Sequence, residues 1–457
     1  MFPFLEACDP SDDEIDALVG ALKSRVGGQN HRVPGGYTYL GQFVDHDITF
    51  DPLSKLQRDN DPHAVVNFRT PRFDLDSLYG SGPVDQPFLY DWTCRPHPGV
   101  KLLVGHNPEH RELAAIDLPR NEQGRALLGD ARNDENLVIA QLHLLFIRFH
   151  NKVVDRVRTS DRQGVMTADE VFAQAQRIVR WHYQWIVVHD YLPRIVGGVA
   201  GRVLRPGAGG GAPTVERRFY TWDGDPAIPV EFSGAAYRFG HSMVRDGYRM
   251  RAGVLAATFV RDAKDERHLG GFRRLPAELE IDWDLFFFKQ QTPPPGANKS
   301  MRIDASLAAP LFFIPPNHQE LARLNLQRGR ALGLPSGPDV ARAMSIEPLT
   351  HEEFDAHVEG EQITASKVAA LRAALHRLPL WAYILLEAEI RSQAGLQLGP
   401  VGGRIVAEVL VGLLEADESS YLRQWPTWTP ELPRSGKDAD PDDFTMIDLV
   451  AFTNDGA

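Results

Sequence analysis

The stretch GQFVDHDITF, residues 41–50, places an imidazole between two carboxylates: Asp45, His46 and Asp47. A neutral imidazole can take and return a proton near physiological pH, which makes His46 a candidate for acid–base chemistry. The same pattern is also typical of a polar turn at the end of a helix or strand. The stretch by itself leaves both interpretations open.

A second cluster of oxygen-bearing side chains follows in TPRFDLDSLYG, residues 70–80, at Thr70, Asp74 and Asp76. The even spacing 70, 72, 74, 76 is what a chain winding around one hard cation would use. Calcium takes six to eight oxygen ligands and mixes carboxylates with backbone carbonyls, and Asp47 could supply another. Alternating aspartates in a solvated turn give the same pattern.

Three further segments carry isolated polar residues. In GDARNDEN, Arg132 and Glu135 are three positions apart and would share one face of a helical turn. In GAAYRFGHSMV, His241 lies in an apolar setting, and in LARLNLQRGRALGLPSG, Asn325 and Arg328 lie on an otherwise apolar helix. Each segment alone favours a structural interpretation. For Arg132 and Glu135 this is a surface ion pair with a helix cap, for His241 a satisfied buried side chain, and for Asn325 and Arg328 a cap or surface positions.

The elements that must position these residues are helical by pattern. Apolar residues recur at helical spacing over 134–157 and 168–190, and further helices are expected at 366–393 and 403–415. The breakers RPGAGGGAP and QTPPPGA are typical of surface loops. Strands do not alternate with helices in a βαβ rhythm, and no internal repeat occurs. The sequence therefore predicts a mainly α protein.

Composition limits the class of protein. The chain has 457 residues, 43% hydrophobic and 24% charged, as in soluble globular proteins. A net charge of -12 argues against a general nucleic-acid binder. No run approaches the ~18 apolar residues of a membrane span. The N-terminus lacks a signal-peptide pattern, and two cysteines, Cys8 and Cys94, fit a reducing compartment. We expect a cytoplasmic protein, or one exported without a recognisable signal peptide.

Taken together and in this order, the segments resemble the animal-type haem peroxidase (peroxidase–cyclooxygenase) superfamily. The resemblance rests on GQFVDHD, TPRFDLDSLYG, DARNDENLVIAQLHLLFIRFHN, AYRFGHSMV and LNLQRGRALGLPSG, and extends to LGPVGGRIVAEVLVGLLEADESSYL. It implies one largely α-helical domain over 1–457 that holds haem b between central helices. Residues 1–35 would form an N-terminal extension, and 425–457 a C-terminal segment packed on the domain or trailing it. The disulfides and propeptide of the secreted mammalian enzymes have no counterpart, so we expect a compact, bacterial-type member.

The resemblance assigns roles on the distal side of the haem. His46 matches the distal histidine, Arg132 the distal arginine, and Gln42 a glutamine associated with halide and water binding. Asp45 and Glu135 match the carboxylates that form ester bonds to haem methyl groups in mammalian peroxidases. These roles suit peroxide cleavage, which needs a base to move a proton between the two oxygens and a cation to stabilise the departing one.

The resemblance also assigns the proximal side. His241 matches the ligand of the haem iron, and Asn325 the residue hydrogen-bonded behind it. Arg238 and Arg328 match positions near the haem propionates. The implied calcium ligands are Asp47, Thr70, Arg72 through its carbonyl, Asp74 and Asp76. Because Asp47 follows His46 directly, the ion would hold the backbone beside the catalytic base.

The implied function is a peroxidase that reduces hydrogen peroxide via compound I and oxidises iodide, bromide, thiocyanate or phenolic donors, as in a response to oxidative stress. The alternative is a fatty-acid (di)oxygenase of the same superfamily, whose radical tyrosine lies three residues before the proximal histidine. Here that position is Arg238, and Tyr237 is one step off, which on a helix is a rotation of about 100°. A haem- or calcium-binding protein without catalysis is disfavoured because both His46 and Arg132 are present.

Other histidines are assigned to packing. His143 and His150, like His182 and His189, are seven residues apart. That spacing places each pair on one helix face but two turns apart, too far to chelate one ion.

Overall fold

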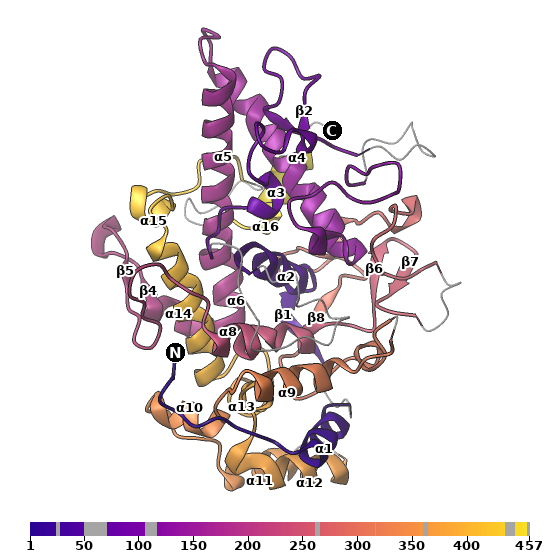
Figure 1. The fold of residues 1–457 in the computed structure, drawn as a ribbon, viewed down its shortest axis with the longest axis vertical. Coiled ribbons are helices and arrows are strands. Elements are labelled where there is room, and N and C mark those ends of the chain that lie inside the picture. Colours follow the sequence, from indigo (N-terminus) through magenta and orange to yellow (C-terminus); the bar gives the residue numbers. More distant parts are fainter. Residues whose placement is uncertain are drawn as a thin grey trace.

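The protein folds around a set of crossing helices (Figure 1). The computed structural model describes residues 1–23, 28–49, 71–105, 117–260, 266–315, 317–359, 364–434 and 444–454. Strands in these parts form only two-stranded antiparallel sheets. The prediction of a mainly α chain is therefore confirmed.

The longer helices lie in every third of the chain. They are α1 (Asp12–Lys23), α2 (Gly36–Ile48), α4 (Leu137–Ser160), α5 (Ala168–Trp185), α9 (Leu321–Ala331), α10 (Gly337–Ala343), α11 (His351–Glu359), α12 (Ala365–Ala374), α13 (Leu380–Arg391), α14 (Pro400–Ala416) and α16 (Met446–Asn454). Shorter ones are α3 (Asp76–Tyr79), α6 (Leu192–Val196), α7 (Ala200–Val203), α8 (Val230–Gly234) and α15 (Tyr421–Gln424).

Two short 3-10 segments and one π-helical turn matter for the site: η3 (Ala131–Asp134), η7 (Ala236–Met243) and the π turn η4 (Ile186–Tyr191). The sheets pair β1 (Gln29–Pro34) with β8 (Lys299–Met301), β2 (Tyr90–Asp91) with β3 (Lys101–Leu102), β4 (Leu204–Arg205) with β5 (Thr214–Val215), and β6 (Gly247–Arg251) with β7 (Val254–Ala257).

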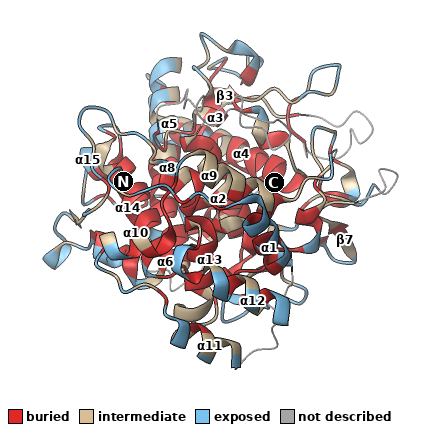
Figure 2. Cartoon of the chain, turned by 60° about the horizontal axis from the view of Figure 1, so that its bottom comes forward, coloured by how far each residue is buried: buried red, intermediate tan, exposed pale blue. Residues whose placement is uncertain are grey.

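Helix α4 forms much of the core and lies among mostly buried residues (Figure 2). Asn136 precedes the helix, and its side chain accepts hydrogen bonds from the backbone N–H groups of Val138 and Ile139 and so caps it. It packs against α2, α5 and α16. Of the described helices, only α4 is long and apolar enough to cross a membrane by length and composition, and 83% of that apolar window is buried inside the protein.

The helix predictions hold at three places and fail at one. Most of 134–157 is α4, which begins three residues later than predicted, and 403–415 lies within α14. The segment 168–190 is helical, as α5 followed by the π turn. The single helix predicted over 366–393 is wrong, because the chain forms α12 and α13 with a break before Pro379. Proline has no N–H to donate and pushes the preceding residue out of the helical region.

Helix α2 lies near the centre of the molecule and brings distant parts of the chain together (Figure 1). It packs against α4, η3 and η7. Segment η7 packs in turn on α13, which also contacts α9. The candidate residues on α2, η3, η7 and α9 thus meet in one region, although they come from four separate stretches of sequence.

Candidate active site

His46 projects from α2 into the core, with 4% of its surface exposed. Its Nδ1 lies 2.7 Å from Oδ1 of Asn133. An amide oxygen can only accept, so Nδ1 carries the proton and Nε2 of the neutral ring carries the lone pair. Burial, reinforced by the positive charge of Arg132, lowers the pKa of His46 to about 4. The ring is therefore a neutral base at physiological pH.

Arg132 is fixed beside this imidazole. Its Nη2 lies 2.7 Å from Oδ2 of the buried Asp130 and 3.0 Å from the carbonyl oxygen of His46, and it also donates to the carbonyl of Thr49. Burial alone would lower the pKa of Arg132, but its hydrogen bonds to Asp130 outweigh burial and the pKa is raised. The site therefore holds a permanent cation in a set orientation next to a neutral base.

Glu135 and Gln42 complete this group. Nε2 of Gln42 donates to Oε1 of Glu135, and Oε1 of Gln42 accepts from Nδ2 of Asn136 at 3.2 Å. Oε1 of Glu135 lies 3.7 Å from Nε2 of His46. Burial raises the pKa of Glu135 to about 7 against the opposing effect of Arg132. Because 25% of the Glu135 side chain is exposed, water reaches this carboxyl group and moderates the effect.

The three consecutive ionisable residues of α2 enter three different environments. Successive side chains of a helix are about 100° apart. His46 meets Asn133, whereas Asp47 is completely buried beside other carboxylates. Asp45 is half-buried on a third side, where its charge adds to burial in raising the pKa of Tyr237.

Asp47, Asp74 and Asp76 form a carboxylate cluster. One ligand oxygen from each lies within 4.8 Å of the others. Leu75, between the last two, adopts left-handed backbone angles (φ 56°, ψ 37°) that a non-glycine residue rarely takes, and its N–H donates to Oδ2 of Asp47 at 3.3 Å. Three carboxylates this close repel one another, and oxygen donors of this kind suit a hard divalent cation.

The other two predicted ligands, Thr70 and the carbonyl of Arg72, stay predictions. Thr70 lies outside the described residues. Arg72 is described and its side chain is exposed.

The second histidine of the site lies on η7. Nδ1 of His241 is 2.9 Å from Nδ2 of Asn325 on α9, and Oδ1 of Asn325 is 3.5 Å from Nη1 of Arg238. Burial, together with the charges of Arg238 and Arg328, lowers the pKa of His241 to about 3. Burial and Arg328 also lower the pKa of Arg238 to about 10. A neutral imidazole thus sits among guanidinium groups, in surroundings that favour an anionic ligand.

The structure therefore gathers the predicted residues into two groups on segments that pack directly against each other, α2 and η7. One group lies on α2 and η3, and the other on η7 and α9. The first contains Gln42, Asp45, His46, Arg132 and Glu135, and the second contains Arg238, His241, Asn325 and Arg328.

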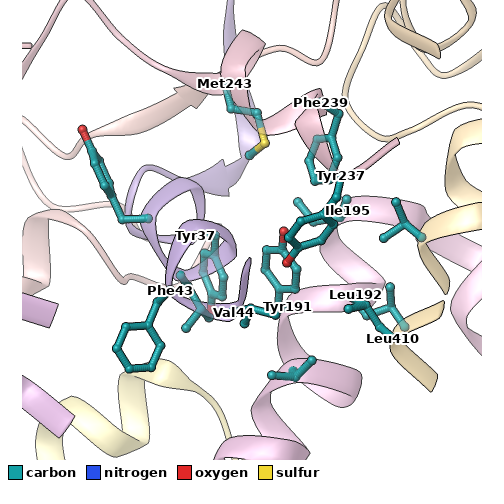
Figure 3. Close-up of a cluster of buried hydrophobic side chains, with 14 of the residues drawn as sticks. Tyr37, Phe43, Val44, Tyr191, Leu192, Ile195, Tyr237, Phe239, Met243 and Leu410 are labelled. Carbon is teal, nitrogen blue, oxygen red and sulfur yellow. The ribbon is translucent and has the colours of Figure 1, made fainter. Parts of the chain in front are cut away.

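Tyr237 turns toward the π turn. Its ring stacks on Phe232, with centroids 4.6 Å apart. Its hydroxyl end points toward that of Tyr191 (Figure 3). Tyr191 in turn fits closely over Gly41 of α2, where an added Cβ would lie 2.5 Å from the phenol oxygen. Tyr237 is therefore part of a tightly packed aromatic cluster.

Sequence reasoning missed Asn133 and gave His143 only a packing role. His143 is buried on α4 as expected, but its Nδ1 also lies 2.9 Å from Nδ2 of Asn133. The amide of Asn133 therefore joins His143 to His46. The sequence offers only a weak indication of this contact, namely a polar residue directly after Arg132 and a histidine on an apolar helix face.

Four buried histidines predict that the protein loses stability in acid. Burial lowers the pKa values of His46, His143, His150 and His182 to about 4, 3, 4 and 3. Unfolded, each would titrate near 6.5. The unfolded chain thus binds these protons more tightly, so the contribution is full above about pH 6.5 and is lost as pH falls toward 4. A tenfold difference in proton affinity between the folded and unfolded chain corresponds to ~1.4 kcal/mol.

Urea unfolding between about pH 7 and pH 4.5 would show this as a free energy of unfolding that falls by several kcal/mol. Glu135 and Glu387 act in the opposite direction, because burial raises both pKa values to about 7 and stability from these groups is lost as pH rises through that value. Two carboxyl groups oppose these four imidazoles and His241, whose pKa is also lowered, to about 3. A free energy that stays constant or rises on acidification contradicts the prediction.

The chain is similar to known proteins over most of its length. A family model described as animal haem peroxidase matches residues 53–424. Thyroid peroxidase of Sus scrofa is 25% identical over 385 residues, covering 78% of this chain and 38% of that protein. Heme peroxidase 2 of Caenorhabditis elegans is 25% identical over 454 residues, covering 84% of this chain and 58% of that protein. The chain thus spans less than two thirds of either relative.

Solved structures share the fold. Peroxidase A from Dictyostelium discoideum superposes with a TM-score of 0.57 at 16% identity, covering 92% of this chain and 88% of that one. Fatty acid alpha-dioxygenase of Oryza sativa gives a TM-score of 0.61 at 18% identity, covering 93% and 78%. One architecture therefore accommodates proteins named for two different activities.

Proposed function

We propose that this chain, which belongs to the animal haem peroxidase family, is a haem-dependent peroxidase that reduces hydrogen peroxide and oxidises small anions or phenols. One observation carries the proposal. Two neutral imidazoles, His46 and His241, lie on segments that pack against each other, and an asparagine side chain contacts Nδ1 of each ring. We expect Nε2 of His46 to serve as the base, and Nε2 of His241 would hold the iron of a bound haem.

The residues around His241 fit a haem group. Arg238 and Arg328 supply positive charge for two propionates, and they are close enough that Arg328 adds to burial in lowering the pKa of Arg238. Ligation through Nε2 requires a proton on Nδ1 of His241, so Asn325 would present its oxygen to the ring after a half-turn of its amide. When bound, haem supplies an iron that accepts peroxide and stores two oxidising equivalents.

The residues around His46 do the proton chemistry. Nε2 of His46 takes a proton from the near peroxide oxygen and returns it to the departing one. The guanidinium of Arg132 stabilises the negative charge that develops on the departing oxygen. Gln42 is held between Glu135 and Asn136 and orients small ligands beside the base. Asp130 keeps Arg132 charged and in place.

Stopped-flow absorption of the haem-loaded protein tests this function. We expect the Soret band to drop within milliseconds of adding stoichiometric peroxide and to recover when iodide or a phenol is added. A normal ferric spectrum that ignores peroxide would contradict the proposal, and fatty-acid oxygenation would then be the function to test.

Calcium binding by Asp47, Asp74 and Asp76, with Thr70 and the carbonyl of Arg72, is part of the proposal. Terbium luminescence offers a direct assay, because Tyr183 lies within the electrostatic reach of the three aspartates, which add to burial in raising its pKa. We expect sensitised emission that calcium displaces. Chelation should lower the free energy of unfolding by about 2.7 kcal/mol relative to calcium at 100 times Kd.

Matched variants separate binding from sensitisation. Tyr183→Phe should lose the emission yet keep the calcium-dependent stability, whereas Asp76→Asn should lose both. Asp225→Asn, a change at an exposed aspartate, should alter neither. Stability that is independent of calcium in the parent protein would rule out the site.

We further predict ester bonds between haem and both Asp45 and Glu135. Glu135 is already held in position by the hydrogen bond from Gln42. After treatment with peroxide, acid–organic extraction should leave haem on the parent protein. Asp45→Asn with Glu135→Gln should release all of it. Complete release from the parent protein would refute the prediction.

A further inference from the structure

The distal base belongs to a chain of hydrogen bonds that continues into the core. Nδ1 of His46 donates to Oδ1 of Asn133 over 2.7 Å, and Nδ2 of Asn133 donates to Nδ1 of His143 over 2.9 Å. His46, Asn133 and His143 are 4%, 0% and 1% exposed. Three different elements supply them: α2, η3 and α4. Water therefore has little access to these side chains and cannot readily replace either hydrogen bond.

An amide between two imidazoles couples their tautomers. One end of the Asn133 side chain only accepts and the other only donates. When its oxygen faces His46, that ring must carry its proton on Nδ1, and Nε2 is bare. When the amide is turned over, Nδ2 would face His46 and the ring would carry its proton on Nε2, where it could not take a proton from peroxide.

His143 meets the other end of the Asn133 amide. With the amide nitrogen on this side, Nδ1 of His143 accepts and its own proton lies on Nε2. The ring is held on α4 against Phe43, with centroids 6.2 Å apart. Burial keeps it neutral, because the pKa of His143 is lowered to about 3. In its Nε2–H tautomer, the neutral ring offers Nδ1 as an acceptor to the amide nitrogen.

We propose that Asn133 and His143 are positioning residues that hold His46 in the tautomer whose Nε2 accepts the proton from peroxide. The inference rests on the proposed function, since it concerns the same proton transfer. Asn133 supplies the acceptor that selects the tautomer. His143 supplies the acceptor that prevents the amide from turning over. Neither residue contacts the reacting oxygens.

Four variants of the haem-loaded protein test the relay. Asn133→Leu and His143→Leu remove the two acceptors and should each slow the reaction with peroxide about 10–100-fold, the range typical of side chains that orient a metal-ligating histidine. Asn133→Asp keeps an acceptor for His46, and His143→Gln keeps one for the amide, so both should retain most of the rate. Reduction by iodide or a phenol after the peroxide step should be unchanged in all four.

Gln141→Leu is the matched control. Gln141 is a buried amide on the same helix that bonds backbone groups, the carbonyls of Leu137 and Leu279 and the N–H of Ile281. Its loss should lower stability without slowing the peroxide step. Equal rates in the parent protein and both leucine variants would overturn the proposal, as would Asn133→Asp and His143→Gln being as slow as the leucine variants.

A second readout does not depend on turnover. In protein labelled with 15N-histidine and loaded with diamagnetic zinc protoporphyrin, the 15N shifts of His46 report which ring nitrogen carries the proton. We expect Nδ1–H in the parent protein and a mixture of tautomers in His143→Leu. A parent protein that shows Nε2–H refutes the relay. If the parent protein shows Nδ1–H but ignores peroxide, the proposed function fails while the relay stands.

Discussion

His46→Ala is expected to slow the reaction of the haem-loaded protein with hydrogen peroxide by about 10²–10⁴-fold, the usual contribution of a positioned general base. The ring is neutral, buried and oriented by Asn133, so no other group within the described site replaces it at the same place. Haem content and the ferric spectrum should remain those of the parent protein. Stopped-flow kinetics with a range of peroxide concentrations give the rate constant directly.

His182→Ala serves as the control, because His182 is equally buried but bonds backbone groups of α5 and the C-terminal part. It should react with peroxide at the parent rate. In the parent protein the rate constant should be flat from about pH 7 to about pH 5 and fall as pH approaches about 4, where His46 becomes protonated. A variant at position 46 that keeps the parent rate would remove His46 from the mechanism.

His241→Gly is expected to abolish axial ligation from the protein. Removing the imidazole leaves a space beside Asn325 and Arg238 with positive charge nearby. Haem should bind weakly and without the spectrum of a histidine-ligated ferric iron. Adding free imidazole should restore that spectrum, because the small molecule can occupy the vacated position and meet the side chain of Asn325.

The control for this experiment is His351→Gly, at an exposed histidine that begins α11. It should keep haem and respond to imidazole as the parent protein does. Absorption titration with haem, with and without imidazole, measures both effects. A His241→Gly protein that keeps the parent spectrum without imidazole would show that another residue ligates the iron.

Helices with a strong apolar period could be predicted from the sequence, and α4 and α14 appear near the expected positions. Helix α2 could not, although it carries the base. It contains Gly36 and Gly41 and has no side-chain cap. Its glycines are needed for close packing, since an added Cβ at Gly36 would lie 2.7 Å from the carbonyl oxygen of Phe286. Such packing is a property of the folded chain, not of the local sequence.

The candidate site was predictable as a set of residues but not as a network. The order of the motifs, and the resemblance they carry, predicted roles for His46, Arg132 and His241, and the structure places these residues on segments that pack together. The bond from Asn133 to His143 depends on how η3 meets α4, and no spacing along the chain encodes that contact. Pro379 in the sequence marks the break between α12 and α13. The apolar residues at helical spacing on both sides of it favoured a single helix instead.

The π turn at Ile186–Tyr191 constrains how this protein can evolve. A π turn is commonly an α-helix that has accepted one extra residue, which rotates everything after it by about 100°. Here that rotation places the Tyr191 side chain against Gly41, which has no side chain of its own. Deleting one residue from the turn would move the Tyr191 phenol away from α2 and leave a cavity. A larger residue in place of Gly41 would collide with that phenol. The two segments, about 150 residues apart along the chain, therefore depend on each other structurally, and we expect a change in one to require a matching change in the other.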